Sequence, residues 1–138
     1  MTLVEVQAKK IMTPIVRSLP SYVKDSQHAV QIFRDLYFLG DDKLIFTLDI
    51  TSLYTFIPNG EGLLALKHFF DLRTVKEPSS ETLLRLAELV LTLNCFSFAD
   101  SYYKQINGVA MGTKMGPSYA NLFVGYIVAQ IFQSTQRP

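Results

Sequence analysis

The sequence contains no tryptophan and a single cysteine, Cys95, and only 18% of its 138 residues are charged. One cysteine excludes an intrachain disulfide and a cysteine-based zinc site. No apolar run reaches the ~18 uninterrupted residues of a membrane-spanning helix, since the best candidate, 122–132, contains Gly125 and Gln130. The amino-terminal stretch MTLVEVQAKKIM lacks the apolar segment and cleavage site of a secretory signal. We therefore expect no membrane partner and an intracellular location.

The charges of the chain nearly cancel, because thirteen basic and twelve acidic residues leave a net charge of +1. This balance excludes binding of nucleic acid through bulk charge alone, although a local basic patch is compatible with it. The hydrophobic fraction is 49%, with ten Phe and seven Tyr, which excludes intrinsic disorder. The length suits one domain. The apolar composition favours a chain whose surface meets further segments of a larger protein.

Hydrophobic periodicity predicts the element order α-α-β-α-α-β-β-loop-α. The expected helices cover, in chain order, 3–19, 26–39, 61–72, 80–94 and the residues from Pro117 onward. Asp25 or Ser26 can cap the second helix. The residues expected to face the core are, in the first helix, Val4, Ala8, Ile11, Ile15 and Leu19, and in the second, Ala29, Ile32, Phe33, Leu36 and Leu39.

Two stretches predict β-structure. The run Lys43–Asp49 is short and almost continuously apolar, as expected of a strand that is covered on both faces. Phe96–Gln105 alternates around a turn at Asp100-Ser101, which predicts a β-hairpin. We expect the strand and the hairpin to form one twisted sheet backed by the helices over 61–72 and 80–94. The predicted fold class is α/β (α+β), with a small sheet backed by helices.

Asp49 is a candidate metal ligand, because a carboxylate at the end of a rigid apolar strand has a defined position. An alternative is that its side chain caps the following turn, and the residues around Asp49 do not decide between the two. Nucleophilic catalysis has no support, since no serine has a visible base partner and His28 and His68 are isolated in the sequence.

The segment GVAMGTKMGP, Gly108–Pro117, is rich in glycine and contains Lys114. It differs from a phosphate-binding loop, because only three residues separate Gly108 from Gly112 and Thr113 stands before the lysine. Glycines in front of a helix can let another backbone or a base pair lie close. They also suit a plain connection between a hairpin and a helix, and the residues alone leave both interpretations open.

Together, the two segments are more informative than either alone. Residues 44–58, LIFTLDITSLYTFIP, resemble motif A of reverse transcriptases, and residues 105–123, QINGVAMGTKMGPSYANLF, resemble motif B in the expected order. The residues of both motifs, together with LPSYVKD at 19–25 and NCFSF at 94–98, are similar to sequences of the Penelope-like retroelement branch. The resemblance implies that 1–138 is a single partial reverse transcriptase domain, part of the palm, without the start of the fingers, motif C or the thumb.

The resemblance also implies roles for individual residues of motif A. Asp49 would hold both catalytic magnesium ions, assisted at one of them by the backbone carbonyl of Ile50. Tyr54 would lie under the incoming sugar and exclude a 2′-hydroxyl, the group that distinguishes ribonucleotides from deoxyribonucleotides.

In motif B, the resemblance implies that Gly112 and Pro117 shape a loop that supports the template and the nascent base pair. Lys114 is a further candidate contact to phosphate, and Asn121 would brace the following helix. Two positions depart from the common pattern: Met111 stands where many reverse transcriptases carry Gln, and Gly116 replaces Ser or Ala, which we expect to loosen the loop.

Motif C, an aromatic-x-Asp-Asp hairpin with the remaining magnesium ligands, is expected after the motif B helix, but no residue after Pro117 is Asp or Glu. Two-metal phosphoryl transfer needs two cations about 3.5–4 Å apart, clamped by carboxylates. Asp49 alone cannot offset their charge. We therefore expect the isolated chain to lack polymerase activity and to bind Mg²⁺ weakly.

The expected function is that of a fragment of an RNA-directed DNA polymerase from a retrotransposable element. The partners of the parent enzyme would be an RNA template, a DNA primer, deoxynucleoside triphosphates and the missing polymerase segments, and its location would be nuclear. A first alternative is a non-catalytic remnant that binds nucleic acid or protein and needs no motif C. A second is an unrelated small α/β domain, against which the ordered motif strings count.

Overall fold

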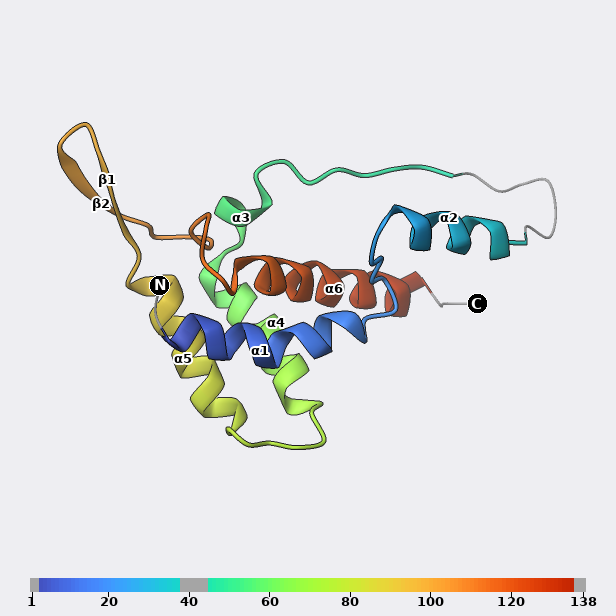
Figure 1. The fold of residues 1–138 in the computed structure, drawn as a ribbon, viewed down its shortest axis with the longest axis horizontal. Helices are drawn as coiled ribbons and strands as arrows, with labels where there is room; N and C mark the ends of the chain where they lie inside the picture. Colours follow the sequence, from blue (N-terminus) through green and yellow to red (C-terminus); the bar gives the residue numbers. More distant parts are fainter. Residues whose placement is uncertain (1–2, 38–44, 136–138) are drawn as a thin grey trace.

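The computed structural model describes residues 3–37 and 45–135. In chain order (Figure 1), its elements are α1 (Leu3–Arg17), α2 (Ser26–Asp35), α3 (Leu53–Phe56), α4 (Asn59–Asp71), α5 (Ser80–Thr92), β1 (Cys95–Phe98), β2 (Ser101–Lys104) and α6 (Gly116–Thr135). In this part of the chain, several helices accompany one two-stranded antiparallel sheet. The coarse α+β class is therefore confirmed.

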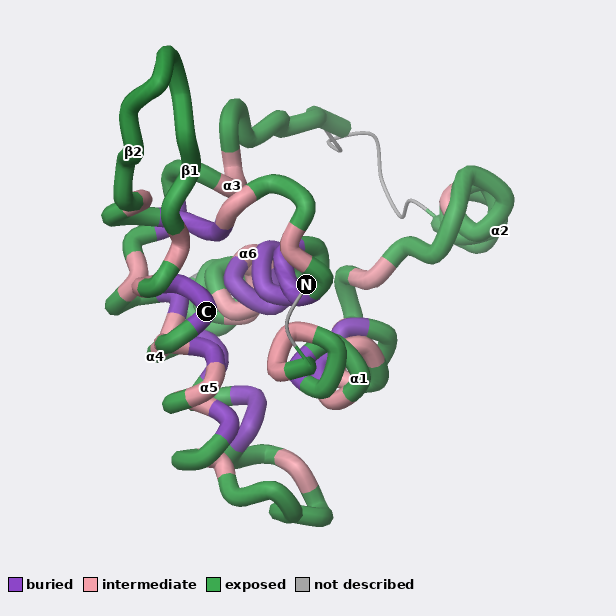
Figure 2. Tube along the Cα trace, turned by 60° about the vertical axis from the view of Figure 1, so that its left-hand side comes forward, coloured by how far each residue is buried: buried purple, intermediate pink, exposed green. Residues whose placement is uncertain are grey.

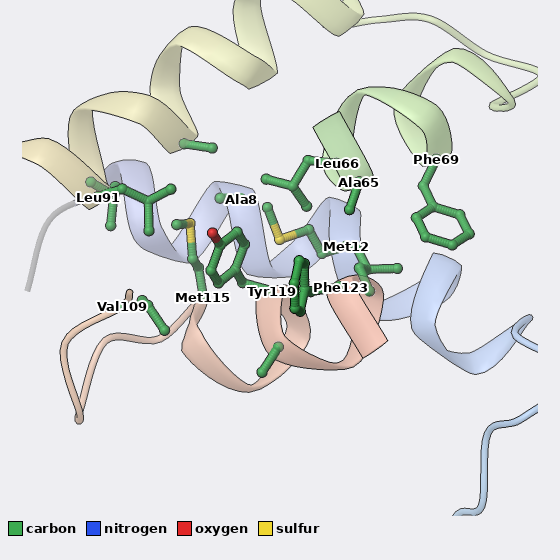
Figure 3. Close-up of a cluster of buried hydrophobic side chains, with 14 of the residues drawn as sticks. Ala8, Met12, Ala65, Leu66, Phe69, Leu91, Val109, Met115, Tyr119 and Phe123 are labelled. Atoms are coloured by element: carbon green, nitrogen blue, oxygen red, sulfur yellow. The ribbon is translucent and has the colours of Figure 1, made fainter. Parts of the chain in front are cut away.

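The core lies where α1, α4, α5 and α6 meet. The helix α6 contacts α1 and α4, and α5 packs on α1 and α4. Figure 3 shows side chains from all four helices gathered around Tyr119 of α6 and around Met115, which directly precedes that helix. The largest fully buried side chains are Tyr119, Phe70, Met12, Ile57, Leu66, Leu91, Met115, Leu122 and Val109. Burying one large apolar side chain contributes about 1.5–3 kcal/mol, so this cluster dominates the stability of the fold.

Local sequence signals position the helix ends. Oδ1 of Asp25 accepts a hydrogen bond from the backbone N–H of His28 at 2.9 Å, so Asp25 caps α2. Ser79 caps α5 in the same way, through its Oγ and the N–H of Thr82 at 3.1 Å. Pro117 lies in the first turn of α6, where a missing N–H costs nothing. The helices predicted from periodicity are all present, with small shifts in their bounds.

The predicted hairpin is confirmed as well. Phe96 pairs with Tyr103, and Phe98 with Ser101. Its two central turn residues are Ala99 and Asp100, both with positive φ, one position earlier than expected. A turn of this handedness matches the right-handed twist of the strands.

The predicted strand Lys43–Asp49 is wrong for every residue that can be assessed. Ile45–Asp49 has no strand structure, and Lys43 and Leu44 lie outside the described residues. The side chains in this stretch are largely exposed, Leu48 by 86%. A strand covered on both faces needs hydrogen-bonded neighbours and covering layers, and the described residues supply neither, because α4 and α5 pack on α1 and α6 instead. The expected sheet of strand and hairpin, backed by α4 and α5, is not formed.

The predicted burial of the second helix is also wrong. No residue of α2 is buried, and Ile32, Phe33 and Leu36 are exposed; Leu39 lies outside the described residues. Figure 2 shows α2 standing apart from the core helices. Periodicity identified an amphipathic helix correctly, but an apolar face is buried only where another element covers it.

Within 3–37 and 45–135, no helix combines the length and apolar character needed to cross a membrane.

At Gly62, α4 packs tightly on Tyr119 of α6. A Cβ added there would lie 1.7 Å from Oη of Tyr119 and 3.0 Å from a side-chain carbon of Ile57. Tyr119 is fully buried, and its hydroxyl has no hydrogen-bond partner among the residues that the structure describes. This burial raises the pKa of Tyr119 above its ordinary value of 10.0. The missing side chain of Gly62 thus makes room for a tyrosine in the centre of the core.

We predict that Gly62→Ala lowers the free energy of unfolding by about 2 kcal/mol, because the added methyl group overpacks against Tyr119. Gly60→Ala is the matched control in the same helix, since a Cβ there would meet nothing within 4 Å. We expect it to change stability by less than about 1 kcal/mol, in the stabilising direction. Urea denaturation followed by circular dichroism measures both. Equal effects would show that the Gly62–Tyr119 contact does not limit the packing of α4 on α6.

A second prediction concerns the stability of the fold at alkaline pH. Below pH 10, Tyr119 is protonated in both the folded and the unfolded chain and contributes no pH dependence. Above pH 10 the unfolded chain loses this proton and the folded chain retains it, because burial raises the folded-state pKa. Stability should therefore fall with rising pH, by about 1.4 kcal/mol from Tyr119 at pH 11.

Tyr119→Phe should remove this part of the decline and leave stability at pH 7 unchanged or slightly higher, since it deletes an unpaired buried hydroxyl. Urea denaturation of both proteins at pH 7, 10 and 11 measures the difference. The same loss between pH 10 and 11 in both would contradict the prediction.

Candidate functional site

The two segments that resemble motifs A and B meet directly in the structure. The backbone N–H of Val109 donates to the carbonyl of Tyr54 at 2.7 Å, and the N–H of Gly108 donates to the carbonyl of Ile57 at 2.9 Å. Ile57 and Val109 are both fully buried. Two backbone hydrogen bonds in a buried setting hold a position well, because breaking either would leave polar groups unpaired away from water. The end of α3 and the start of the glycine-rich loop therefore form one unit.

This junction requires glycine at position 108. Its φ is +74°, and a Cβ there would lie 2.2 Å from the carbonyl oxygen of Tyr54 and 2.7 Å from Cα of Thr55. Both atoms belong to the backbone and cannot move aside. Gly112 also has a positive φ, +97°, but a Cβ there would meet nothing within 4 Å. Gly108 thus permits close backbone contact, whereas Gly112 only relieves conformational strain at an exposed position.

Gly116 packs tightly rather than loosening the loop, which corrects the expectation from the sequence. It is buried, and a Cβ there would lie 2.9 Å from Oγ1 of Thr113 and 3.4 Å from Cε1 of Tyr54. The space of the missing side chain is thus taken by the Tyr54 ring and the Thr113 hydroxyl. The half-buried ring of Tyr54 packs on the start of α6 for this reason.

Short-range hydrogen bonds order the rest of the loop. Oγ1 of Thr113 donates to the carbonyl of Ala110 at 2.9 Å, and the N–H of Gly116 donates to the carbonyl of Thr113 at 3.2 Å. The backbone N–H of Lys114 lies 3.4 Å from Oε2 of Glu5 on α1. The Lys114 side chain takes part in no ion pair within the described residues and is exposed.

The start of α6 is braced from within. Nδ2 of Asn121 donates to the carbonyl of Pro117 at 2.8 Å, across one turn. Asn121 itself is exposed, so this bond leaves its Oδ1 open to solvent.

A contact that the sequence did not indicate anchors the chain between the hairpin and the loop. Nδ2 of Asn59, the first residue of α4, donates to the carbonyl of Ile106 at 3.1 Å. The N–H of Gln105 also donates to the carbonyl of Asn94 at 3.0 Å, closing the base of the hairpin. Asn59 directly follows the motif A string and begins α4, and its role depends on a partner that is distant in the sequence.

Asp49 lies in the exposed stretch before α3, and Ile50 beside it is 51% exposed. The carboxylate of Asp49 has no hydrogen-bond or ion-pair partner in the described part of the chain. The following turn is closed instead by Thr55, whose N–H and Oγ1 both donate to the carbonyl of Ser52. The capping role considered for Asp49 is therefore not observed.

The described residues do not by themselves fit a two-magnesium site. No group of three or more His, Cys, Asp or Glu side chains gathers anywhere in 3–37 and 45–135. Mg²⁺ is usually held by one or two carboxylates together with substrate phosphates, so Asp49 supplies one ligand at most. A separate groove of about 550 Å³ between α4 and α5 is lined by Leu63, Leu84, Lys67 and Arg85, among others, and contains none of the predicted site residues.

We predict that Gly108→Ala lowers the free energy of unfolding by about 3 kcal/mol or more, because a positive φ and a backbone clash act together. Gly112→Ala is the matched control, with the strained φ but no clash, and we expect a loss of about 1 kcal/mol. Urea denaturation of both variants measures the difference. A Gly112→Ala protein as unstable as Gly108→Ala would contradict the importance of the Tyr54–Val109 junction.

Comparison with known proteins identified no relative of the chain. No protein-family model, no curated protein and no solved structure matches the chain. The features that bear on function are therefore the motif strings and the junction between them.

Proposed function

We propose that the chain is the motif A and motif B part of the palm of an RNA-directed DNA polymerase from a Penelope-like retroelement. The parent enzyme would add deoxynucleotides to a DNA primer on an RNA template, in the nucleus. The observation that carries the proposal is the direct joining of the two motif strings, through Val109 on Tyr54 and Gly108 on Ile57. A polymerase must bring these two strings to one nucleotide, and an unrelated domain has no need to do so.

The proposal gives the residues of the junction separate tasks. The backbone of Tyr54 is held by Val109, and its ring rests on Gly116, so the ring is a stiff platform against which a 2′-hydroxyl would clash. Gly112 and Lys114 are exposed on the loop, where they can approach a base pair and a phosphate. Asn121 keeps the start of α6 in place through Pro117.

Magnesium belongs to the parent enzyme in this proposal, where it would stabilise charge on the transferred phosphoryl group. Asp49 is suited to contribute one ligand, since its carboxylate is exposed and unpaired in the described chain, and the backbone carbonyl of Ile50 follows directly. The remaining carboxylates would come from motif C, which these 138 residues do not contain.

A second candidate function is a remnant that binds protein or nucleic acid without catalysis. It is favoured by the exposed apolar residues outside the core, among them Phe46 and Leu48 before α3 and Phe33 on α2. Exposed apolar surface of this kind marks interaction sites. A polymerase fragment presents such surface for a different reason, namely that the rest of the palm covers it.

We predict that the isolated chain extends no primer on an RNA template, with or without Mg²⁺, because it holds a single candidate magnesium ligand. The assay uses purified chain, labelled DNA primer and the four deoxynucleoside triphosphates, with Asp49→Ala as control. Extension that disappears in Asp49→Ala would show that motif C is not needed, contrary to our view.

The decisive experiment restores the missing parts. Residues 44–123 replace the corresponding segment of an active reverse transcriptase of the Penelope-like branch, and we expect the chimera to extend primers. In the chimera, Asp49→Asn should reduce the rate at least ~100-fold, whereas Asp100→Asn, in the exposed turn of the hairpin, is the control and should leave the rate unchanged. Tyr54→Val should raise ribonucleotide incorporation at least ~10-fold. A folded chimera whose activity is indifferent to Asp49 would refute the polymerase proposal.

A further inference from the structure

We propose that Asn59 is a positioning residue for sugar selection: by holding the carbonyl of Ile106 it fixes the start of the glycine-rich loop, and through that loop the position of Tyr54. The selectivity role rests on the proposed polymerase function, whereas the coupling between Asn59 and the loop is a property of the isolated chain. Asn59 lies outside both motif strings, so the resemblance assigns it no role.

Three hydrogen bonds join residues 54–59 to residues 106–109. The donors, acceptors and distances are Val109 N–H to the Tyr54 carbonyl at 2.7 Å, Gly108 N–H to the Ile57 carbonyl at 2.9 Å, and Asn59 Nδ2 to the Ile106 carbonyl at 3.1 Å. The first two bonds join backbone to backbone. The bond of Asn59 is made by a side chain, so a substitution can remove it while the backbone keeps its other partners.

The amide of Asn59 has one favourable orientation. Its Nδ2 faces the carbonyl of Ile106, and a rotated amide would bring Oδ1 against that carbonyl, placing two acceptors together. Oδ1 is buried and has no hydrogen-bond partner within the described part of the chain. The bond to Ile106, a residue 47 positions away in the sequence, is therefore the attachment that orients this side chain.

The attachment point lies between the hairpin and the buried junction. The hairpin ends at Lys104, all of its strand residues are exposed, and it projects from the helices (Figure 1). A two-stranded hairpin of this kind is marginally stable in water. Gln105 is tied to the base of the hairpin through Asn94, and Gly108 belongs to the junction. By holding Ile106 between them, Asn59 isolates the junction from movements of the hairpin.

The junction in turn holds Tyr54. The carbonyl of Tyr54 accepts from Val109, and its ring lies against Gly116, where a Cβ would be 3.4 Å from Cε1. In the proposed function, this ring clashes with a 2′-hydroxyl, and it does so only while it is held in place. An opened junction would let the ring retreat and a ribonucleotide enter. Asn59 therefore acts on sugar selection through Tyr54.

Amide hydrogen exchange of the isolated chain tests the coupling. Asn59→Asp keeps the shape of the side chain but replaces the donor with an acceptor. Because Asn59 is the first residue of α4, a carboxylate there interacts favourably with the helix dipole, and a role confined to α4 predicts no loss of protection. We expect the protection factors of the Gly108 and Val109 amides to fall by about 3- to 10-fold, the effect of losing one hydrogen bond.

Asn107→Asp is the matched control for this experiment. It makes the same change one residue before Gly108, on an exposed side chain that forms no hydrogen bond within the described residues. Protection factors already correct for the effect of a neighbouring residue on intrinsic exchange. We expect those of Gly108 and Val109 to stay as in the unaltered chain.

The chimera that carries residues 44–123 tests the selectivity role. Asn59→Asp should lower the preference for deoxynucleotides over ribonucleotides, measured as the ratio of the two kcat/KM values, by about threefold, and Asn107→Asp should leave it unchanged. A general loss of structure slows both reactions and leaves their ratio as it was. In a Tyr54→Val background, Asn59→Asp should change the ratio no further, because Asn59 acts through Tyr54.

Unchanged protection of Gly108 and Val109 in Asn59→Asp would overturn the inference. So would an unchanged sugar preference in a chimera that still needs Asp49, and the polymerase function would then stand without a role for Asn59. An equal effect of Asn59→Asp with and without Tyr54→Val would also contradict it, since the effect would then bypass the Tyr54 ring. A chimera indifferent to Asp49 would refute both proposals together.

Discussion

The contact on which most of the structure depends is the packing of Tyr119 against Gly62 in the centre of the core. Tyr119 lies in the first turn of α6, so its position follows from where the preceding loop ends. That loop is held at its start by hydrogen bonds from Gly108 and Val109 to the end of α3. The junction of the two motif strings and the packing of the helices are therefore one arrangement, and glycines at 62 and 108 make it sterically possible.

Outside this core, the chain exposes an unusual amount of apolar surface. It is concentrated in the stretch before α3, in α2 and in the hairpin, which carry Phe46, Leu48, Phe33, Phe98 and Tyr102, all at least 61% exposed. Monomeric soluble proteins rarely leave contiguous apolar surface uncovered. The helical core buries its own apolar faces, whereas the apolar side chains of these three elements have no cover within the described chain.

One part of the candidate site is held in place by packing and hydrogen bonds, and the other part is not. The platform formed by Tyr54, Gly116 and the loop is packed and hydrogen-bonded, so its geometry does not depend on a ligand. The Asp49 carboxylate, in contrast, lies in a stretch without regular structure and has no partner in the described chain. A polymerase site needs both halves to be rigid. Covering strands beside Ile45–Ile50 would be required to hold Asp49 as firmly as Tyr54 is held.

The sequence by itself determined the five longer helices, the caps of α2 and α5 and the hairpin, because these depend on hydrogen bonds between residues close in the chain; the short helix α3 was not predicted. It also indicated Gly108–Gly116 as a special loop. Only the tertiary structure decided that α2 is uncovered, that Ile45–Asp49 forms no strand, and that Gly116 packs tightly on Tyr54. Each of these depends on a distant partner, which periodicity cannot identify. An apolar pattern states that a face can be buried, and the presence of a neighbour decides whether it is.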